Sequence, residues 1–202
     1  MRIALLTDIH ANREALAAAL AVLPGKPLIN SVNGEEASLN RILPVVKEYG
    51  AAVIGLTMDD DGIPTTVDRR LAVAHKILER AASLGIPAED VIIDTLVLTV
   101  GADSKAASVT LKTVERVRQE LGVNISLGAS NVSFGMPERH TINQAFLVLA
   151  IAAGAACAIT DPVKLALTIR AADLLRGRDD RGRRYLGYWR TQQAMQPAQG
   201  TS

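Results

Sequence analysis

Short apolar runs rich in β-branched residues alternate six times along the chain with longer segments of helical period. In the longer segments, apolar residues recur every three to four positions, as on one face of a helix. The predicted strands are Ile3–Thr7, Pro27–Ser31, Ala52–Thr57, Val91–Asp94, Asn124–Leu127 and Ala156–Ile159. The predicted helices are Asn12–Leu23, Glu36–Tyr49, Thr66–Leu84, Ser104–Leu121, Glu138–Ala153 and Pro162–Leu175. This alternation predicts a parallel sheet.

The helix predicted over Thr66–Leu84 shows the helical period most clearly. Its apolar face carries Val67, Leu71, Ala74, Ile77, Leu78, Ala81 and Leu84. The opposite, polar face is assigned Asp68, Arg69, Arg70, Lys76, Glu79 and Arg80. Gly85 and Pro87 follow, and both residue types commonly end helices.

Two architectures fit six strand–helix units: a doubly wound sheet and an incomplete (β/α) barrel of the TIM type. No Gly-x-Gly-x-x-Gly follows any predicted strand, which weakens the case for a dinucleotide-binding sheet. The phosphate-binding Gly-x-x-x-x-Gly-Lys pattern is also missing. The period alone does not choose between the two architectures.

Composition narrows the class of protein. Hydrophobic residues make up 49% of the 202 residues but aromatics only 3%, so Ala, Val, Leu and Ile must build the core. Because 22 basic and 21 acidic residues nearly balance, no nucleic-acid partner is indicated. A single cysteine, Cys157, fits a reducing, cytoplasmic setting, and we interpret it as a small core residue of a strand. The longest apolar run, Ala145–Ile159, is too short to span a membrane, and no leader sequence is evident.

The C-terminal part has a different composition. Five arginines lie within Arg176–Arg184, and Tyr185, Tyr188 and Trp189 follow. We interpret this region as a terminal helix that covers the end of the barrel; a basic docking surface for an acidic partner is the alternative. We expect residues 1–190 to form one domain and residues 191–202 to be a polar, disordered tail.

Two segments with polar residues at strand ends point to a family. They are Asp94-Thr-Leu-Val and Gly128-Ala-Ser-Asn-Val-Ser-Phe-Gly. Together with Asn12-Arg-Glu-Ala-Leu and the segment from Pro24 to Glu35, they resemble the pterin-binding methyltransferases, which are relatives of dihydropteroate synthase. The methyltetrahydrofolate:corrinoid methyltransferases look most similar, from about Asp8 to about Arg190. The resemblance implies a barrel of eight units, so two units would be expected before Met1.

The first dozen residues also resemble a second protein family. Asp8 and His10 resemble the Asp-x-His of calcineurin-like metallophosphoesterases, in which such residues bind metal. The later motifs of that family are missing from this sequence, so we expect no di-metal centre. The chain is either a truncated member of the pterin family or one whose first residues were joined or recast from elsewhere.

The chemistry of a methyl group on N5 of tetrahydrofolate sets the requirements for a site. The leaving amine must be stabilised by a proton or hydrogen bond, and a carboxylate can accept from the pterin's donors. The resemblance implies that Asp8, Asn30 and Asp94 hold the pterin and that Asn131 acts at N5. It also implies a pocket position for Arg139. Candidate rim residues are Asp59, Ser130 and Phe134.

Each of these residues also has a purely local interpretation. Asn30 and Asn131 could be turn residues, and Asp94 could cap its loop. For Asp59, a solvated turn at Asp59–Asp61 is favoured over a site. The family usually has proline after the aspartate, where this chain has Thr95.

The sequence therefore predicts a domain that binds methyltetrahydrofolate and passes its methyl group to cobalamin on a corrinoid protein. Dihydropteroate synthase activity is less favoured, because the basic residues of a pyrophosphate site are not recognisable. A pterin-binding remnant without turnover and a phosphoesterase that uses Asp8 and His10 are the alternatives. Unpaired sheet edges would also favour pairing of two copies.

Overall fold

A computed structural model describes residues 5–6 and 13–195. Within them, five parallel strands form one sheet in the order β1-β2-β3-β4-β5. The strands are β1 (Leu5–Leu6), β2 (Leu28–Asn33), β3 (Ala52–Leu56), β4 (Val91–Asp94) and β5 (Asn124–Ser126). The helices are α1 (Arg13–Val22), α2 (Glu36–Glu48), α3 (Val67–Ser83), α4 (Ala106–Arg116), α5 (Arg139–Ala153), α6 (Pro162–Leu175) and α7 (Arg183–Met195). The α/β class and the parallel sheet predicted from the sequence are confirmed.

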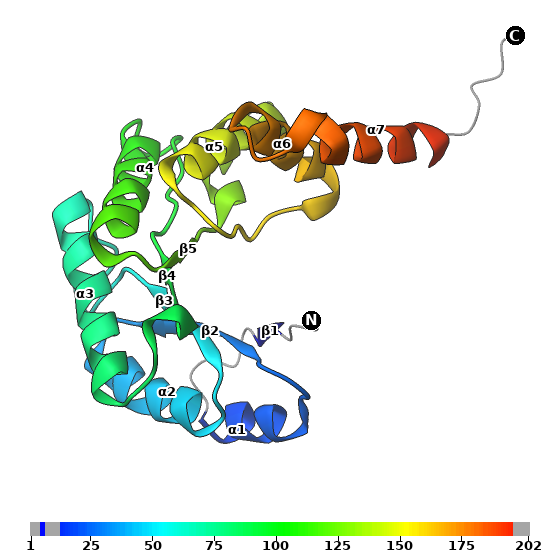
Figure 1. Cartoon of the computed structure of the whole chain (residues 1–202). Helices are drawn as coiled ribbons and strands as arrows, with labels where there is room; N and C mark the ends of the chain where they lie inside the picture. The colour runs from blue at the N-terminus through cyan, green and yellow to red at the C-terminus, as the bar shows by residue number, and fades with distance from the viewer. Residues whose placement is uncertain (1–4, 7–12, 196–202) are drawn as a thin grey trace, which may run out of the picture.

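The sheet is curved, and helices α1 to α6 follow its outer side in an arc (Figure 1). The outer face of the sheet and the apolar faces of the helices make the core, as in the buried side chains of Val53, Ile93 and Ile125. Gly55 on β3 allows α3 to approach closely, because a Cβ there would lie 3.0 Å from Ile77 Cγ2. The chain thus forms part of a barrel wall, with the strand ends at one rim.

The sixth predicted strand, Ala156–Ile159, is wrong as a strand. The segment does lie beside β5, because the Cys157 and Ile159 amides donate to Ile125 O and Leu127 O at 3.0 and 2.9 Å. Within the described residues, no strand covers its other edge. Cys157 is accordingly exposed, not buried in the core as expected.

Helix α3 confirms the predicted period, but one assignment within it is wrong. Thr66 Oγ1 caps the helix by accepting from the Arg69 amide. Arg70 was placed on the polar face, yet only 1% of it is exposed. It lies three residues after Val67 and four before Ala74, which is the spacing of the buried stripe.

The C-terminal region forms the predicted terminal helix. Arg184 pairs with Asp173 of α6 at 3.5 Å, and the Arg170 guanidinium stacks over the Tyr188 ring at 4.1 Å. Helix α7 continues to Met195, five residues into the expected tail, and residues 196–202 lie outside the described part of the chain. None of the helices in that part combines the length and apolar character that a membrane span requires.

Candidate functional site

A cavity of about 600 Å³ opens at the carboxyl ends of the strands. Its polar lining residues are Asn30, Asp94, Ser130, Asn131 and Thr160. The remaining lining residues are Leu56, Ile63, Leu96, Val97, Leu98, Gly128 and Ile159. A mostly apolar wall with a few polar groups is typical of small-molecule sites of this volume. The structure therefore brings together four predicted site residues from three places in the chain: Asn30 within β2, Asp94 at the end of β4, and Ser130 and Asn131 in the turn after β5.

Asn30 reaches the cavity from an irregular point in β2. The pairing of β2 with β3 shifts register between Asn30 and Val32. Such a bulge re-aims side chains near the end of a strand. Asn30 is half-buried, so its amide can offer both a donor and an acceptor to a ligand.

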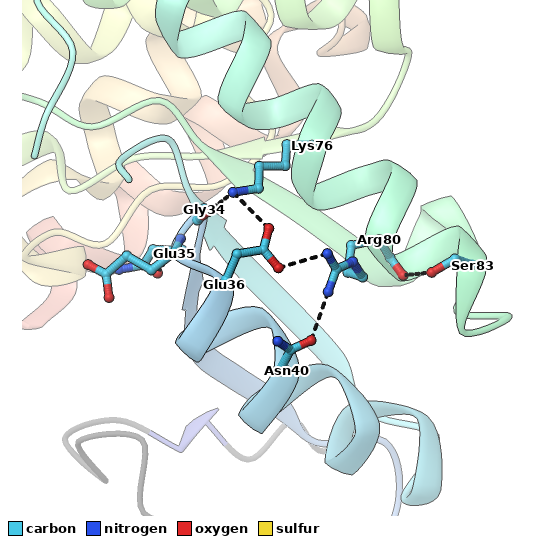
Figure 2. A network of polar contacts seen from close by, with 8 residues as sticks. Gly34, Glu35, Glu36, Asn40, Lys76, Arg80 and Ser83 are labelled. Carbon is cyan, nitrogen blue, oxygen red and sulfur yellow. Dashed lines mark hydrogen bonds and ion pairs between the residues drawn. The ribbon is translucent and has the colours of Figure 1, made fainter. Parts of the chain in front are cut away.

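The turn after β2 is fixed from outside by charged side chains of α3 (Figure 2). Lys76 Nζ donates to Gly34 O at 2.6 Å and lies 3.0 Å from Glu36 Oε1. Arg80 bridges Glu36 and Asn40, each at 2.8 Å. The hydrogen bonds from Lys76 and Arg80 lower the pKa of the Glu36 carboxyl. This network ties Gly34 and the beginning of α2 to α3, shortly after Asn30 in the chain.

Asp94 ends β4 with its carboxyl group almost fully buried at the cavity. Burial raises the pKa of this carboxyl to about 6, while a hydrogen bond from Leu96 and the charge of Arg70 act in the opposite direction. The Leu96 amide donates to Asp94 Oδ1 at 2.8 Å, so the expected local cap exists as well. Among the described residues that line the cavity, Asp94 is the only acid or base. A buried acceptor of this kind suits a ligand that presents a row of N–H donors.

Asn131 lies in a 3-10 turn, Ala129–Ser133, that follows β5. Its amide folds over Gly128, since a Cβ at position 128 would lie 3.0 Å from Asn131 Nδ2. The Asn131 side chain is exposed at the open side of the cavity. Its amide can therefore donate to a ligand atom at the open side, where a second molecule could also reach the ligand.

Arg139 and Phe134 are not among the lining residues of the cavity. The Arg139 guanidinium instead donates to Ser130 O at 2.9 Å and to Ser133 Oγ at 3.1 Å, because the 3-10 turn Ala129–Ser133 packs against α5. Phe134 is 67% exposed and lies beneath the same guanidinium. Arg139 thus supports the turn that carries Asn131, while Ser130 lines the cavity directly.

Asp59 belongs to a tight turn. Its backbone bridges to Gly62, and its side chain accepts from the Asp61 amide at 3.1 Å. It lines a separate, smaller cavity of about 200 Å³ that shares Ile63 with the larger one. The expected turn is therefore present, while a place for Asp59 at the rim of a site stays a prediction.

Asp8 and His10 lie outside the described residues, so their predicted roles stay predictions. Within residues 13–195, no cluster of three or more His, Cys, Asp or Glu side chains could hold a metal ion. His75 and His140 are both exposed. The residue that sequence reasoning missed is Arg70, which contacts the loop after Asp94; a charged residue at the spacing of the buried stripe was the available signal.

Fold and cavity together define a parallel α/β protein with a barrel-type wall and a polar ligand pocket at the strand ends. The chain belongs to the family described as pterin binding enzyme, whose model matches residues 10–161.

A methyltransferase and a methionine synthase are among its relatives. A methylcorrinoid:tetrahydrofolate methyltransferase of Eubacterium limosum is 28% identical over 177 residues, which are 85% of this chain and 65% of that protein. Methionine synthase of Mycobacterium tuberculosis is 31% identical over 163 residues, which are 74% of this chain and 14% of that protein. The chain therefore spans just under two thirds of the first relative and a small part of the second.

Solved structures of dihydropteroate synthases share the fold. The enzyme from Clostridium difficile, solved in the presence of pteroic acid, matches with a TM-score of 0.61 at 21% identity, over 82% of this chain and 65% of that one. The enzyme from Coxiella burnetii, in complex with pteroic acid, matches with a TM-score of 0.54 at 16% identity, over 82% of this chain and 74% of that one.

Proposed function

We propose that this chain binds methyltetrahydrofolate and exchanges its methyl group with the cobalt of a corrinoid carried by a partner protein. One observation carries the proposal: Asn30 of β2, Asp94 at the end of β4 and Asn131 in the turn after β5 line one cavity. The similarity to a methylcorrinoid:tetrahydrofolate methyltransferase supports the choice of substrate and acceptor. The buried Asp94 carboxyl would accept from the N–H donors of the pterin, and Asn30 would fix the orientation of the ring.

Asn131 is the proposed catalytic residue. When the bond between N5 and the methyl carbon breaks, its electron pair stays on N5. A hydrogen bond can stabilise the negative charge that grows there, and a proton from solvent must then reach N5 to complete tetrahydrofolate. The Asn131 amide can supply an N–H at the open side of the cavity. A corrinoid bound by the partner would supply the nucleophilic metal that takes the methyl carbon. Nucleophile and amide would then act on opposite sides of the breaking bond.

The direction of transfer is part of the proposal. The Eubacterium limosum relative is named for transfer from methylcorrinoid to tetrahydrofolate. The same donor would serve in that direction, because a hydrogen bond that stabilises the transition state lowers the barrier equally both ways. We therefore expect exchange in both directions, with the net direction set by the concentrations of the two methyl carriers.

The direct test is titration of the chain with methyltetrahydrofolate, followed by calorimetry, with cobalt absorbance then reporting transfer to and from cobalamin. Saturable binding with transfer supports the whole proposal. Binding without transfer to either free or protein-bound cobalamin would favour a pterin-binding remnant. Failure to bind either folate would contradict the assignment of the cavity.

Gly128→Ala should impair transfer without unfolding the chain. The new methyl group would lie 3.0 Å from Asn131 Nδ2, so the flexible amide must move away. Gly128 has φ −76°, which alanine adopts without strain. We expect transfer to slow about tenfold or more, with a change below about 1 kcal/mol in the free energy of unfolding. Single-turnover rates and urea unfolding provide the measurements.

Gly187→Ala is the matched control, because a Cβ at that position of α7 meets nothing within 4 Å. It should leave transfer unchanged. A Gly128→Ala protein with the wild-type transfer rate would show that the amide position over Gly128 does not matter.

A further inference from the structure

Arg70 is a buried charge that the proposed reaction does not use. Its guanidinium donates to Pro64 O, Thr95 O and Leu96 O, each at 2.8 Å. It also donates to Thr110 Oγ1 at 3.2 Å. All four acceptors are uncharged. Since arginine stays protonated in proteins, the folded chain keeps a cation here without a hydrogen-bonded carboxylate.

Burial of this charge is costly, so we expect the guanidinium to do something that an apolar side chain cannot. Moving a charge out of water carries a penalty of several kcal/mol that only well-made hydrogen bonds offset. A methionine of similar length would fill the same space without that penalty. What methionine could not do is donate to several carbonyls in two different loops.

The carbonyls that Arg70 binds belong to the turn that holds Asp94. Leu96 has φ +55°, a left-handed conformation that is strained for leucine and needs support from its surroundings. Its carbonyl accepts from Arg70 and, at 2.9 Å, from Thr110 Oγ1. Its amide donates to Asp94 Oδ1. A continuous chain of hydrogen bonds therefore leads from Arg70 through Leu96 to the cavity carboxylate.

We propose that Arg70 is a positioning residue of the pterin site: by binding the Thr95 and Leu96 carbonyls, it keeps the Leu96 amide aimed at Asp94 and the Asp94 carboxylate held at the cavity. The pterin part of this inference rests on the proposed function. The positive charge of Arg70 also favours the ionised carboxylate, against the effect of burial. The other polar lining groups described, Asn30, Ser130, Asn131 and Thr160, do not titrate.

The first readout uses no ligand. Carbon-13 NMR of the aspartate carboxyl groups, assigned with Asp94→Asn, gives the pKa of Asp94 in each variant. Arg70→Met removes the charge and loosens the Leu96 hydrogen bond, so we expect the pKa of Asp94 to rise by about one unit or more. Arg70→Lys keeps a charge but cannot serve the same acceptors together, and should give a smaller rise. Thr110→Val removes only the second donor to Leu96 O and should shift the pKa slightly in the same direction.

The second readout is the affinity for methyltetrahydrofolate against pH. In Arg70→Met, the pH below which binding is lost should rise together with the pKa of Asp94. Arg80→Met is the matched control for the first readout: it also removes an arginine of α3, but one bound to Glu36 and Asn40. Because Arg80 belongs to the network behind the turn after Asn30, only the ligand-free pKa of Asp94 is expected to stay unchanged in Arg80→Met. For both readouts the control is Arg183→Met, which removes an arginine of α7 that faces exposed Asp180 at 3.7 Å and should change neither.

The outcomes separate the two proposals. A folded Arg70→Met protein with the wild-type pKa for Asp94 would overturn the positioning role. If that variant does not fold, Arg70→Lys and Thr110→Val decide by the same criterion, and an unchanged pKa in both overturns the role. If the wild type does not bind the folate, the proposed function fails, while the ligand-free pKa still decides whether Arg70 positions Asp94.

Discussion

Asn131→Ala is expected to slow methyl transfer on the order of 10²–10³-fold, as removal of one donor to a developing negative charge commonly does. Binding of methyltetrahydrofolate should weaken much less, because the methyl-bearing N5 of the bound substrate carries little charge before the bond breaks. An interaction made mainly in the transition state lowers the rate of the chemical step and leaves the dissociation constant nearly unchanged. The Asn131 side chain is exposed, so its truncation should cost little stability.

The measurement combines single-turnover cobalt absorbance with a binding titration on the same preparation. Asn124→Ala is the matched control, since Asn124 is an exposed asparagine on β5 that is not among the cavity-lining residues. Wild-type transfer rates in Asn131→Ala would remove Asn131 from the mechanism. Equal losses in rate and affinity would make it a binding residue only.

Asp94→Asn is expected to weaken pterin binding on the order of 10–100-fold, because an amide replaces a charged acceptor and presents its own donors to the donors of the ring. The same substitution should stabilise the fold at pH 7. Burial raises the pKa of Asp94 from 3.8 to about 6, so the folded chain holds this proton more tightly than the unfolded chain does. At neutral pH the wild type must keep an unfavourably buried charge, which asparagine removes.

The sign of the pH dependence follows from the same shift. Between about pH 4 and about pH 6 the folded state binds more protons at this site than the unfolded state, so stability falls as the pH rises. A shift of roughly two units corresponds to at most about 3 kcal/mol. Asp94→Asn should therefore exceed the wild type in stability at pH 7 and approach it near pH 4.

Urea unfolding of both proteins at pH 4 and pH 7 measures this difference. Asp180→Asn is the control, because Asp180 is an exposed acid whose 3.7 Å ion pair with Arg183 lies in the C-terminal region. A stability difference that does not vary with pH would contradict the raised pKa. Undiminished pterin affinity in Asp94→Asn would contradict its role as an acceptor.

The strand ends could be predicted from the sequence because a simple rule governs them. Parallel strands bring their carboxyl ends to one rim, so polar residues after the apolar runs, such as Asn30 and Asp94, were expected to meet. The segment Ala156–Ile159 shows where the rule fails. Its apolar residues fit a strand, but in the structure the segment meets β5 through only a few backbone hydrogen bonds and is not a regular strand, and a local pattern does not reveal how regular a pairing will be.

Contacts between distant loops were beyond the reach of local patterns. The helical period of α3 places the charged residue Arg70 at the spacing of the buried face. Its partners at Pro64, Thr95 and Leu96, however, follow only from the folded arrangement of two loops. Arg139 is the converse case. Its proximity to the site was expected, yet spacing could not tell whether its guanidinium would meet a ligand or the carbonyl of Ser130.

The exposure of Cys157 gives the experimenter a chemical handle. It is the only cysteine in the sequence, so a thiol-directed fluorophore or spin label would attach at one position without any mutation. It lies two residues before Ile159, which lines the cavity. A probe there would report, in real time and on the unaltered sequence, when a folate enters the cavity and when a corrinoid partner arrives at the rim.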